Sequence, residues 1–133
     1  MSSFDVDKLR DVLRGIASQT ADIEGAALVS YDGIMIANAL QRDSPAEIVA
    51  AITATLLNLG KMSVDVLQLG GLDQVFIKCQ DGYIVIGRAG DSNVVTLMAK
   101  RDAKLGILIN EMNKASEAVL KVLGETPKKK TSR

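Results

Sequence analysis

The stretch Pro45–Val64, which reads PAEIVAAITATLLNLGKMSV, decides the fold of this chain. Its larger apolar side chains recur at helical spacing and predict one apolar helix face, wide enough to lie on a sheet. A second row of apolar and small residues lies about a quarter-turn round the same helix. Since packing on one sheet buries only one face, this row predicts a second neighbour. The first face comprises Ile48, Ile52, Leu56, Leu59 and Met62, and the second row comprises Val49, Thr53, Leu57, Gly60 and Val64.

The rest of this helix is a narrow strip of small and polar residues, which we expect to face solvent or a partner. The strip consists of Glu47, Ala51, Ala54, Asn58, Lys61 and Asp65. One alternative for the second apolar row is a helix wholly buried within a single monomer. A sandwich of this size has little room for such a helix, so the pattern favours self-association.

Length and composition limit the possible classes of protein. A chain of 133 residues with 47% hydrophobic residues predicts one folded domain, which we expect to span residues 1–124. Lys plus Arg and Asp plus Glu number 16 each, so the chain has no overall charge that would favour nucleic acid. One cysteine, a polar N-terminus and the lack of an apolar run of about 20 residues predict a cytoplasmic protein without a membrane span.

Apolar periodicity and turn residues predict the order α-β-β-α-β-β-β-α. Asp32-Gly33 and Asp81-Gly82 each separate two apolar runs, and such turns commonly need a positive φ angle. The strands are almost continuously apolar, which indicates that both faces of the sheet are covered. We therefore predict a three-layer α/β/α sandwich around an antiparallel five-stranded sheet. The predicted helices span 5–18, 45–64 and 102–124, and the predicted strands span 25–30, 34–38, 75–79, 83–87 and 94–98.

The sequence predicts no catalytic residue, no cofactor and no metal site. Without histidine, the chain cannot form a Ser-His-Asp or Cys-His triad or a histidine metal site. Cys79 lies in an apolar strand, where we expect an inert, buried thiol. The glycine patterns do not match a phosphate-binding loop between a strand and a helix. Carboxylates near turns and helix starts are expected to cap and turn the chain.

The last nine residues, 125–133, contain three lysines and an arginine without apolar periodicity. This composition predicts a disordered basic tail. Its interpretation as a solubilising segment is favoured over a contact with an anionic surface.

Several local strings resemble the roadblock/dynein light chain family over residues 5 to 124. They are Ile23-Glu-Gly-Ala-Ala-Leu-Val29, Asp32-Gly33, Ile36-Ala37, the central helix, Leu72-Asp-Gln-Val75, Asp81-Gly-Tyr-Ile-Val-Ile86 and Lys104-Leu-Gly-Ile-Leu108. The resemblance implies a fold related to profilin and longin domains. It also implies a dimer in which central helices lie side by side and edge strands join two sheets. Members regulate or scaffold small Ras-like GTPases, as the MglB type does, or serve as adaptors.

The expected homodimer interface therefore combines the second row of the central helix with the third strand. Its residues are Val49, Thr53, Leu57, Gly60, Val64, Val75, Phe76 and Ile77. We expect the small and polar strip to bind a small Ras-like GTPase, with no catalytic side chain supplied. The alternative is an adaptor that holds other chains together without affecting nucleotide turnover. A small-molecule sensor or an unrecognised enzyme is disfavoured, because no group of polar residues converges in the sequence.

Overall fold

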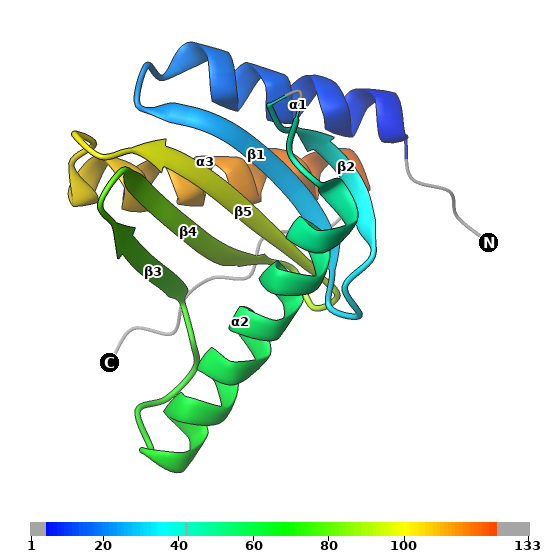
Figure 1. Ribbon diagram of the computed structural model, residues 1–133. Helices are drawn as coiled ribbons and strands as arrows, with labels where there is room; N and C mark the ends of the chain where they lie inside the picture. Colours follow the sequence, from blue (N-terminus) through cyan, green and yellow to red (C-terminus); the bar gives the residue numbers. More distant parts are fainter. Residues whose placement is uncertain (1–4, 42, 125–133) are drawn as a thin grey trace.

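The computed structural model describes residues 5–41 and 43–124 as an α/β/α sandwich. The element order is the predicted one, with three helices and five strands (Figure 1). The elements are α1 (Val6–Gln19), β1 (Ile23–Ser30), β2 (Met35–Ala39), α2 (Ala46–Val66), β3 (Gln74–Cys79), β4 (Gly82–Ala89), β5 (Asn93–Lys100) and α3 (Leu105–Leu123).

The five strands form one antiparallel sheet in the order β2-β1-β5-β4-β3. The three hairpins that the turns predict are present, and an additional pairing of β1 with β5 joins the two halves of the chain. This long-range pairing makes β1 and β5 central strands and leaves β2 and β3 at the edges. Helix α2 contacts both edge strands, β2 and β3.

Figure 1 shows α2 on one face of the sheet, with α1 and α3 together on the other. The larger core cluster lies between the sheet and the α1–α3 layer, and it includes Leu9, Leu28, Val85 and Leu108. Smaller clusters lie beneath α2. Because β1, β4 and β5 are buried on both faces, they read as continuous apolar runs, as expected.

The helix ends agree with the predicted capping at one helix and differ at another. The Asp5 carboxylate accepts a hydrogen bond from the Lys8 backbone N–H at 3.1 Å, so Asp5 caps α1. The last helix begins later than predicted: its N-cap is Lys104 rather than Asp102, without a side-chain hydrogen bond. Its C-terminal end is the expected glycine, since Gly124 adopts φ +75°.

The predicted basic tail at 125–133 lies outside the described residues. α2 is longer than predicted, and its 21 residues are long and apolar enough to cross a bilayer by length and composition alone. This criterion does not separate a membrane span from a helix that packs within a globular fold. In this structure α2 packs on the sheet.

Candidate interaction surface

The outer face of α2, turned away from its own sheet, carries a row of exposed large apolar side chains. Leu59 is 57% exposed and Val66 is 78% exposed. The exposed members of the row are Ile48, Ile52, Leu59, Met62 and Val66, and Leu56 lies partly buried at its margin. We call Ile48, Ile52, Leu59, Met62 and Val66 the outer row. The prediction that this face lies on the sheet is wrong.

The second predicted row lies against the chain's own sheet. Leu57 is fully buried with Ile86 and Val94, and Thr53 is only 2% exposed. Both are inaccessible to a second copy, so their assignment to a dimer interface is wrong. Small residues such as Ala50 and Gly60 also lie on this inner side of the helix, while Ile48, Ile52, Leu59, Met62 and Val66 project outward. The two rows exchange places because both are apolar, and periodicity alone does not distinguish them.

Three further predicted interface residues of α2 occupy intermediate positions. Val49 and Val64 are half-buried at the flanks of the sheet-facing row. Gly60 faces Leu72 and Val75 of the same chain, and an added Cβ atom would lie 3.1 Å from each of their side chains. The contact that Gly60 permits in this structure is therefore between α2 and the β3 region of one chain.

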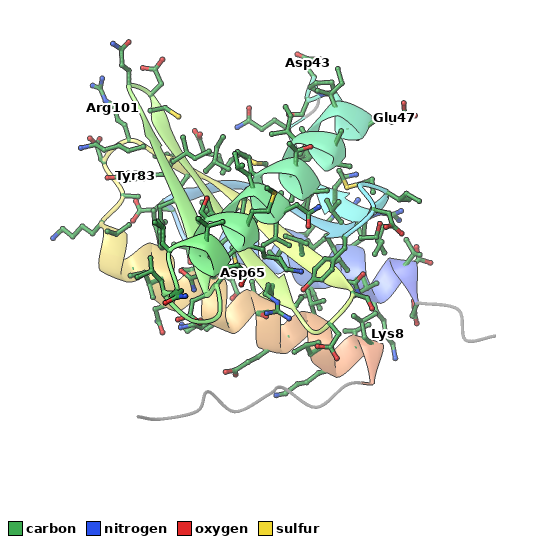
Figure 2. All side chains as sticks on the ribbon, turned by 90° about the horizontal axis from the view of Figure 1, so that it is seen from below. Lys8, Asp43, Glu47, Asp65, Tyr83 and Arg101 are labelled. Atoms are coloured by element: carbon green, nitrogen blue, oxygen red, sulfur yellow. The ribbon has the colours of Figure 1, made fainter. Side chains whose placement is uncertain are left out.

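The predicted partner strip is largely exposed along one flank of α2. Glu47, Ala51, Asn58 and Asp65 are exposed, and Figure 2 shows Glu47 and Asp65 near the two ends of the helix. Ala54 departs from the strip because it is 6% exposed. It packs beside Gly33 of the β1–β2 turn, where a Cβ atom would lie 3.6 Å from the Ala54 Cβ. Ala54 therefore cannot serve as an accessible contact residue.

Lys61 of the strip is half-buried and joins a cluster around Tyr31. Its Nζ atom lies 5.0 Å from the centroid of the Tyr31 ring, within cation–π range. The Arg88 Nε group donates a hydrogen bond to the Tyr31 hydroxyl at 2.9 Å, and this hydroxyl donates to the Gly90 carbonyl at 3.1 Å. This cluster ties α2 to the tips of the two hairpins. The sequence analysis did not find it, because its members come from three distant segments.

The β3 edge carries the remaining predicted interface residues. Val75, Phe76 and Ile77 are all half-buried. Val75 packs with Leu57 under α2, whereas Phe76 packs into the core beneath α3. Cys79 at the end of β3 is exposed, so the prediction of a buried thiol is wrong. It is the last residue of the edge strand β3, whose final two residues are both exposed.

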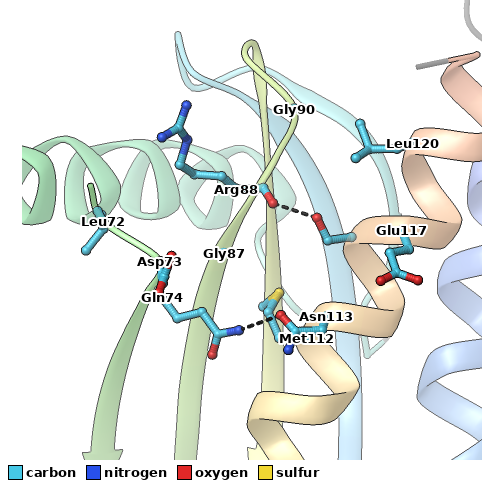
Figure 3. Close-up of a pocket in the computed structure, with 11 residues that line it drawn as sticks. Leu72, Asp73, Gln74, Gly87, Arg88, Gly90, Met112, Asn113, Glu117 and Leu120 are labelled. Atoms are coloured by element: carbon cyan, nitrogen blue, oxygen red, sulfur yellow. Dashed lines mark hydrogen bonds between the residues drawn. The ribbon is translucent and has the colours of Figure 1, made fainter. Parts of the chain in front are cut away.

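A pocket of about 600 Å³ lies between α3 and the segment that enters β3. Its wall includes Leu72, Gln74, Asn113, Glu117 and Leu120. Figure 3 shows the Gln74 amide directed at α3, where its Nε2 group donates to Asn113 Oδ1 at 3.2 Å. The buried Gln74 Oε1 atom has no hydrogen-bond partner among the described residues. Such an unpaired acceptor in a native fold calls for an explanation.

Across 5–41 and 43–124, no group of three or more His, Cys, Asp or Glu side chains is placed to hold a metal ion. The arrangement instead offers an apolar helix face, an edge strand and a mixed polar flank. These are features of a binding surface.

Comparison with known proteins places this arrangement in a family. The Roadblock/LC7 domain model matches residues 11–99. The uncharacterised protein MJ1340 of Methanocaldococcus jannaschii is 29% identical over 104 residues, which are 77% of this chain and 89% of that protein.

Solved structures share the fold at lower identity. Myxococcus xanthus MglB superposes with a TM-score of 0.83 at 17% identity, covering 98% of each chain. A Roadblock/LC7 domain from Streptomyces avermitilis gives a TM-score of 0.80 at 22% identity, covering 86% of this chain and 97% of that one. Profilin II of Acanthamoeba castellanii gives 0.63 at 13% identity, covering 85% and 97% respectively. The family match over most of the sandwich and these folds together show that the chain belongs to the Roadblock/LC7 domain family.

Proposed function

We propose that this chain is a cytoplasmic homodimer that binds a small Ras-like GTPase and regulates or scaffolds it without supplying a catalytic side chain. The proposal rests on the exposure of the outer row of α2. Five large apolar side chains on one helix face stay exposed in the monomer. A row of this kind marks a surface that another protein covers.

The position of α2 relative to β3 supports self-association as the first use of that row. Gly60 packs on Val75, so the helix lies close to the edge strand. Two copies joined at their β3 edges would therefore bring two α2 helices to the same side of a continuous sheet. In a two-fold dimer the same surface of each copy is used, so one apolar row suffices for both.

The exposed flank of α2 supports a further partner. Glu47, Ala51, Asn58 and Asp65 remain accessible beside the outer row, and a two-fold dimer displays this flank twice. Membership of the Roadblock/LC7 family and the fold shared with MglB favour a small GTPase as that partner. Holding the GTPase switch loops in one arrangement would shift their population and so change nucleotide turnover.

The dimer is tested with Leu59→Glu, which places a charge in the middle of the outer row. We expect light scattering to give a dimer mass for the unmodified chain and a monomer mass for the variant. Circular dichroism should be unchanged, because Leu59 is exposed. Asn110→Glu, on the exposed side of α3, is the control and should remain dimeric. A monomer mass for the unmodified chain at micromolar concentration would contradict the proposed dimer.

The partner is tested by titrating a Ras-like GTPase from the same genome in its GDP and GTP-analogue states. We expect Asn58→Arg to abolish binding while the dimer persists, and Asn110→Arg to bind normally. Changed GTP hydrolysis or nucleotide exchange supports regulation, whereas binding without such a change supports the adaptor alternative. Undiminished binding by Asn58→Arg would remove the flank of α2 as the contact, and GTP hydrolysis by the chain alone would overturn the non-enzymatic proposal.

A further inference from the structure

We propose that Lys61 of α2 and Arg88 of β4 together bind one carboxylate of the protein that docks on the exposed flank of α2. This inference rests on the proposed function and adds to it the chemistry of the contact, which is an acidic side chain of the partner placed opposite two cations. Its basis is the arrangement of Lys61 and Arg88 around one tyrosine and the positive charge that remains on them.

Both cations contact the same side chain, Tyr31. The Lys61 Nζ atom lies 5.0 Å from the centroid of the Tyr31 ring, and the Arg88 Nε–H donates to the Tyr31 hydroxyl at 2.9 Å. Lys61 and Arg88 are therefore neighbours in space, although one comes from a helix and the other from a strand. We call Lys61 and Arg88 the cation pair.

Tyr31 is fixed by its backbone, its ring and its hydroxyl. Its N–H donates to the Ser92 carbonyl at 3.0 Å, and its hydroxyl donates to the Gly90 carbonyl at 3.1 Å. The ring packs against the core cluster that contains Leu57. The cation pair is consequently positioned before a partner arrives, which lowers the entropy lost on binding.

The Arg88 side chain lies on the α2 face of the sheet. Ile84 and Ile86, at alternate positions of β4, pack in the cluster beneath α2, and residues two apart on a strand share a face. Figure 3 shows the Arg88 side chain directed away from α3. Its backbone carbonyl alone is tied to α3, where it accepts a hydrogen bond from Ser116 Oγ at 2.6 Å. The guanidinium group therefore belongs to the surface around α2.

The described residues neutralise the cation pair only in part. Arg88 Nη2 lies 4.0 Å from Asp91 Oδ1, which is beyond hydrogen-bonding distance. No ion pair joins Lys61 to a carboxylate within 5–41 and 43–124, even though Asp65 lies one turn further along α2. Tyr31 offers a ring face and a hydroxyl but no charge. Two cations thus share one distant carboxylate, and a positive charge remains.

The remaining charge and the hydrogen-bond donors fit a carboxylate. The Arg88 side chain is 37% exposed and Lys61 is half-buried, so both are accessible. A guanidinium has further N–H donors besides the Nε–H that Tyr31 accepts, and their planar arrangement matches the two oxygens of a carboxylate. A carboxylate brings one negative charge, whereas a phosphate group brings roughly two. The charge balance favours the carboxylate.

The cation pair adjoins the flank that is proposed to bind the partner. Lys61 follows Asn58 by three positions, and side chains at this spacing are neighbours on a helix surface. Asn58 is exposed, so a protein seated on it lies beside Lys61 as well. The cation pair therefore gives the flank a charge preference: a partner with an acidic side chain at this point binds, and one with a basic side chain is repelled.

Changes of charge test the cation pair in titrations of the Ras-like GTPase. Lys61→Glu leaves the hydrogen bond between Tyr31 and Arg88 intact, and we expect it to raise the dissociation constant at least about tenfold. Arg88→Gln should raise the constant about tenfold, and Arg88→Lys less, because it keeps the charge. Lys104→Glu is the matched control: it changes an exposed lysine at the start of α3, on the other face of the sheet, and should bind normally.

Salt dependence separates an ionic contact from a structural effect of these substitutions. Added salt should weaken binding by the unmodified chain more than binding by Lys61→Glu or Arg88→Gln. Unchanged dissociation constants in both variants would overturn the carboxylate site and leave the proposed function intact. Failure of the unmodified chain to bind the GTPase would instead overturn the proposed function itself, so the two failures are distinguishable.

The identity of the bound group is tested from both sides of the contact. In double-mutant cycles with Arg88→Gln, we expect alanine substitution of one Asp or Glu of the GTPase to show coupling, and absence of coupling for every surface Asp and Glu would overturn the assignment. Inorganic phosphate and sodium acetate are titrated separately into the chain, with the Arg88 Nε–H followed by NMR. Phosphate binding tighter than about 1 mM, without a matching effect of acetate, would identify a phosphate site instead of a carboxylate site.

Discussion

Gly60 of α2 lies so close to Val75 of β3 that a Cβ atom added to the glycine would be 3.1 Å from the Val75 Cγ2 atom. The same added atom would lie 3.1 Å from Leu72 Cδ2. A helix residue without a side chain therefore sets the distance between α2 and the edge strand. The outer row and the β3 edge are held in one fixed arrangement by this contact.

Replacement of Gly60 by valine should consequently destabilise the fold. Added methyl groups would force Leu72 and Val75 to move, which costs about 1–3 kcal/mol in a packed site. Urea unfolding at fixed protein concentration measures the change in the free energy of unfolding. Gly106→Ala is the control in α3, where the added Cβ meets no atom within 4 Å. That variant should be neutral or more stable by up to about 1 kcal/mol. Equal behaviour of the two variants would contradict the close contact.

Truncation of Leu57 and of Leu59 should affect different properties, monomer stability and dimer affinity, although the two residues are only two positions apart. Leu57 is fully buried, so Leu57→Ala should lower the free energy of unfolding by about 2–5 kcal/mol. Leu59 is exposed in the monomer, so Leu59→Ala should change monomer stability by less than about 0.5 kcal/mol and weaken the dimer instead. Unfolding below the dimer dissociation constant isolates the first effect, and sedimentation measures the second. A large loss of monomer stability in Leu59→Ala would indicate that the face carrying Leu59 packs on the sheet.

Tyr31→Phe should destabilise the junction between α2 and the hairpin tips by about 1–2 kcal/mol. The substitution leaves Arg88 Nε without its acceptor and removes the hydrogen bond to Gly90, while the ring remains to contact Lys61. Tyr83→Phe provides a matched control, since no hydrogen bond of the Tyr83 hydroxyl is present within the described residues. Thermal unfolding of both variants measures the difference, and equal midpoints would contradict a structural role for the Tyr31 hydroxyl.

Deletion of residues 125–133 should leave the unfolding midpoint within about 2 °C. The last helix is completed before this segment, because the Gly124 N–H donates to the Lys121 carbonyl at 3.2 Å and Gly124 adopts the left-handed conformation that ends a helix. Differential scanning calorimetry of full-length and truncated chains makes the comparison. A midpoint lower by many degrees would show that the tail packs on the domain.

Apolar periodicity and turn dipeptides were sufficient to predict the element order and the hairpins from the sequence. Asp32-Gly33 forms the predicted turn, with Gly33 at φ +87°. Asp81-Gly82 is the same dipeptide, but Gly82 does not have a positive φ angle. A Cβ atom at Gly82 would instead clash with the Ala99 carbonyl oxygen on the neighbouring strand. The dipeptide predicted a turn in both places, but the reason for the second glycine is a contact made only in the folded sheet.

The tertiary structure alone decided which face of α2 is available for binding. Both apolar rows have the same period, so hydrophobic periodicity identifies a helix with two apolar faces but does not orient it. Packing in the folded chain orients it: Ala50, Thr53 and Leu57 are buried on the sheet side, and Leu59 and Met62 project outward. The sequence therefore determined that this helix has two apolar faces. Which row meets the sheet was decided by tertiary packing, because Leu57 fits against Ile86 and Val94 while Leu59, of the same size, stays exposed.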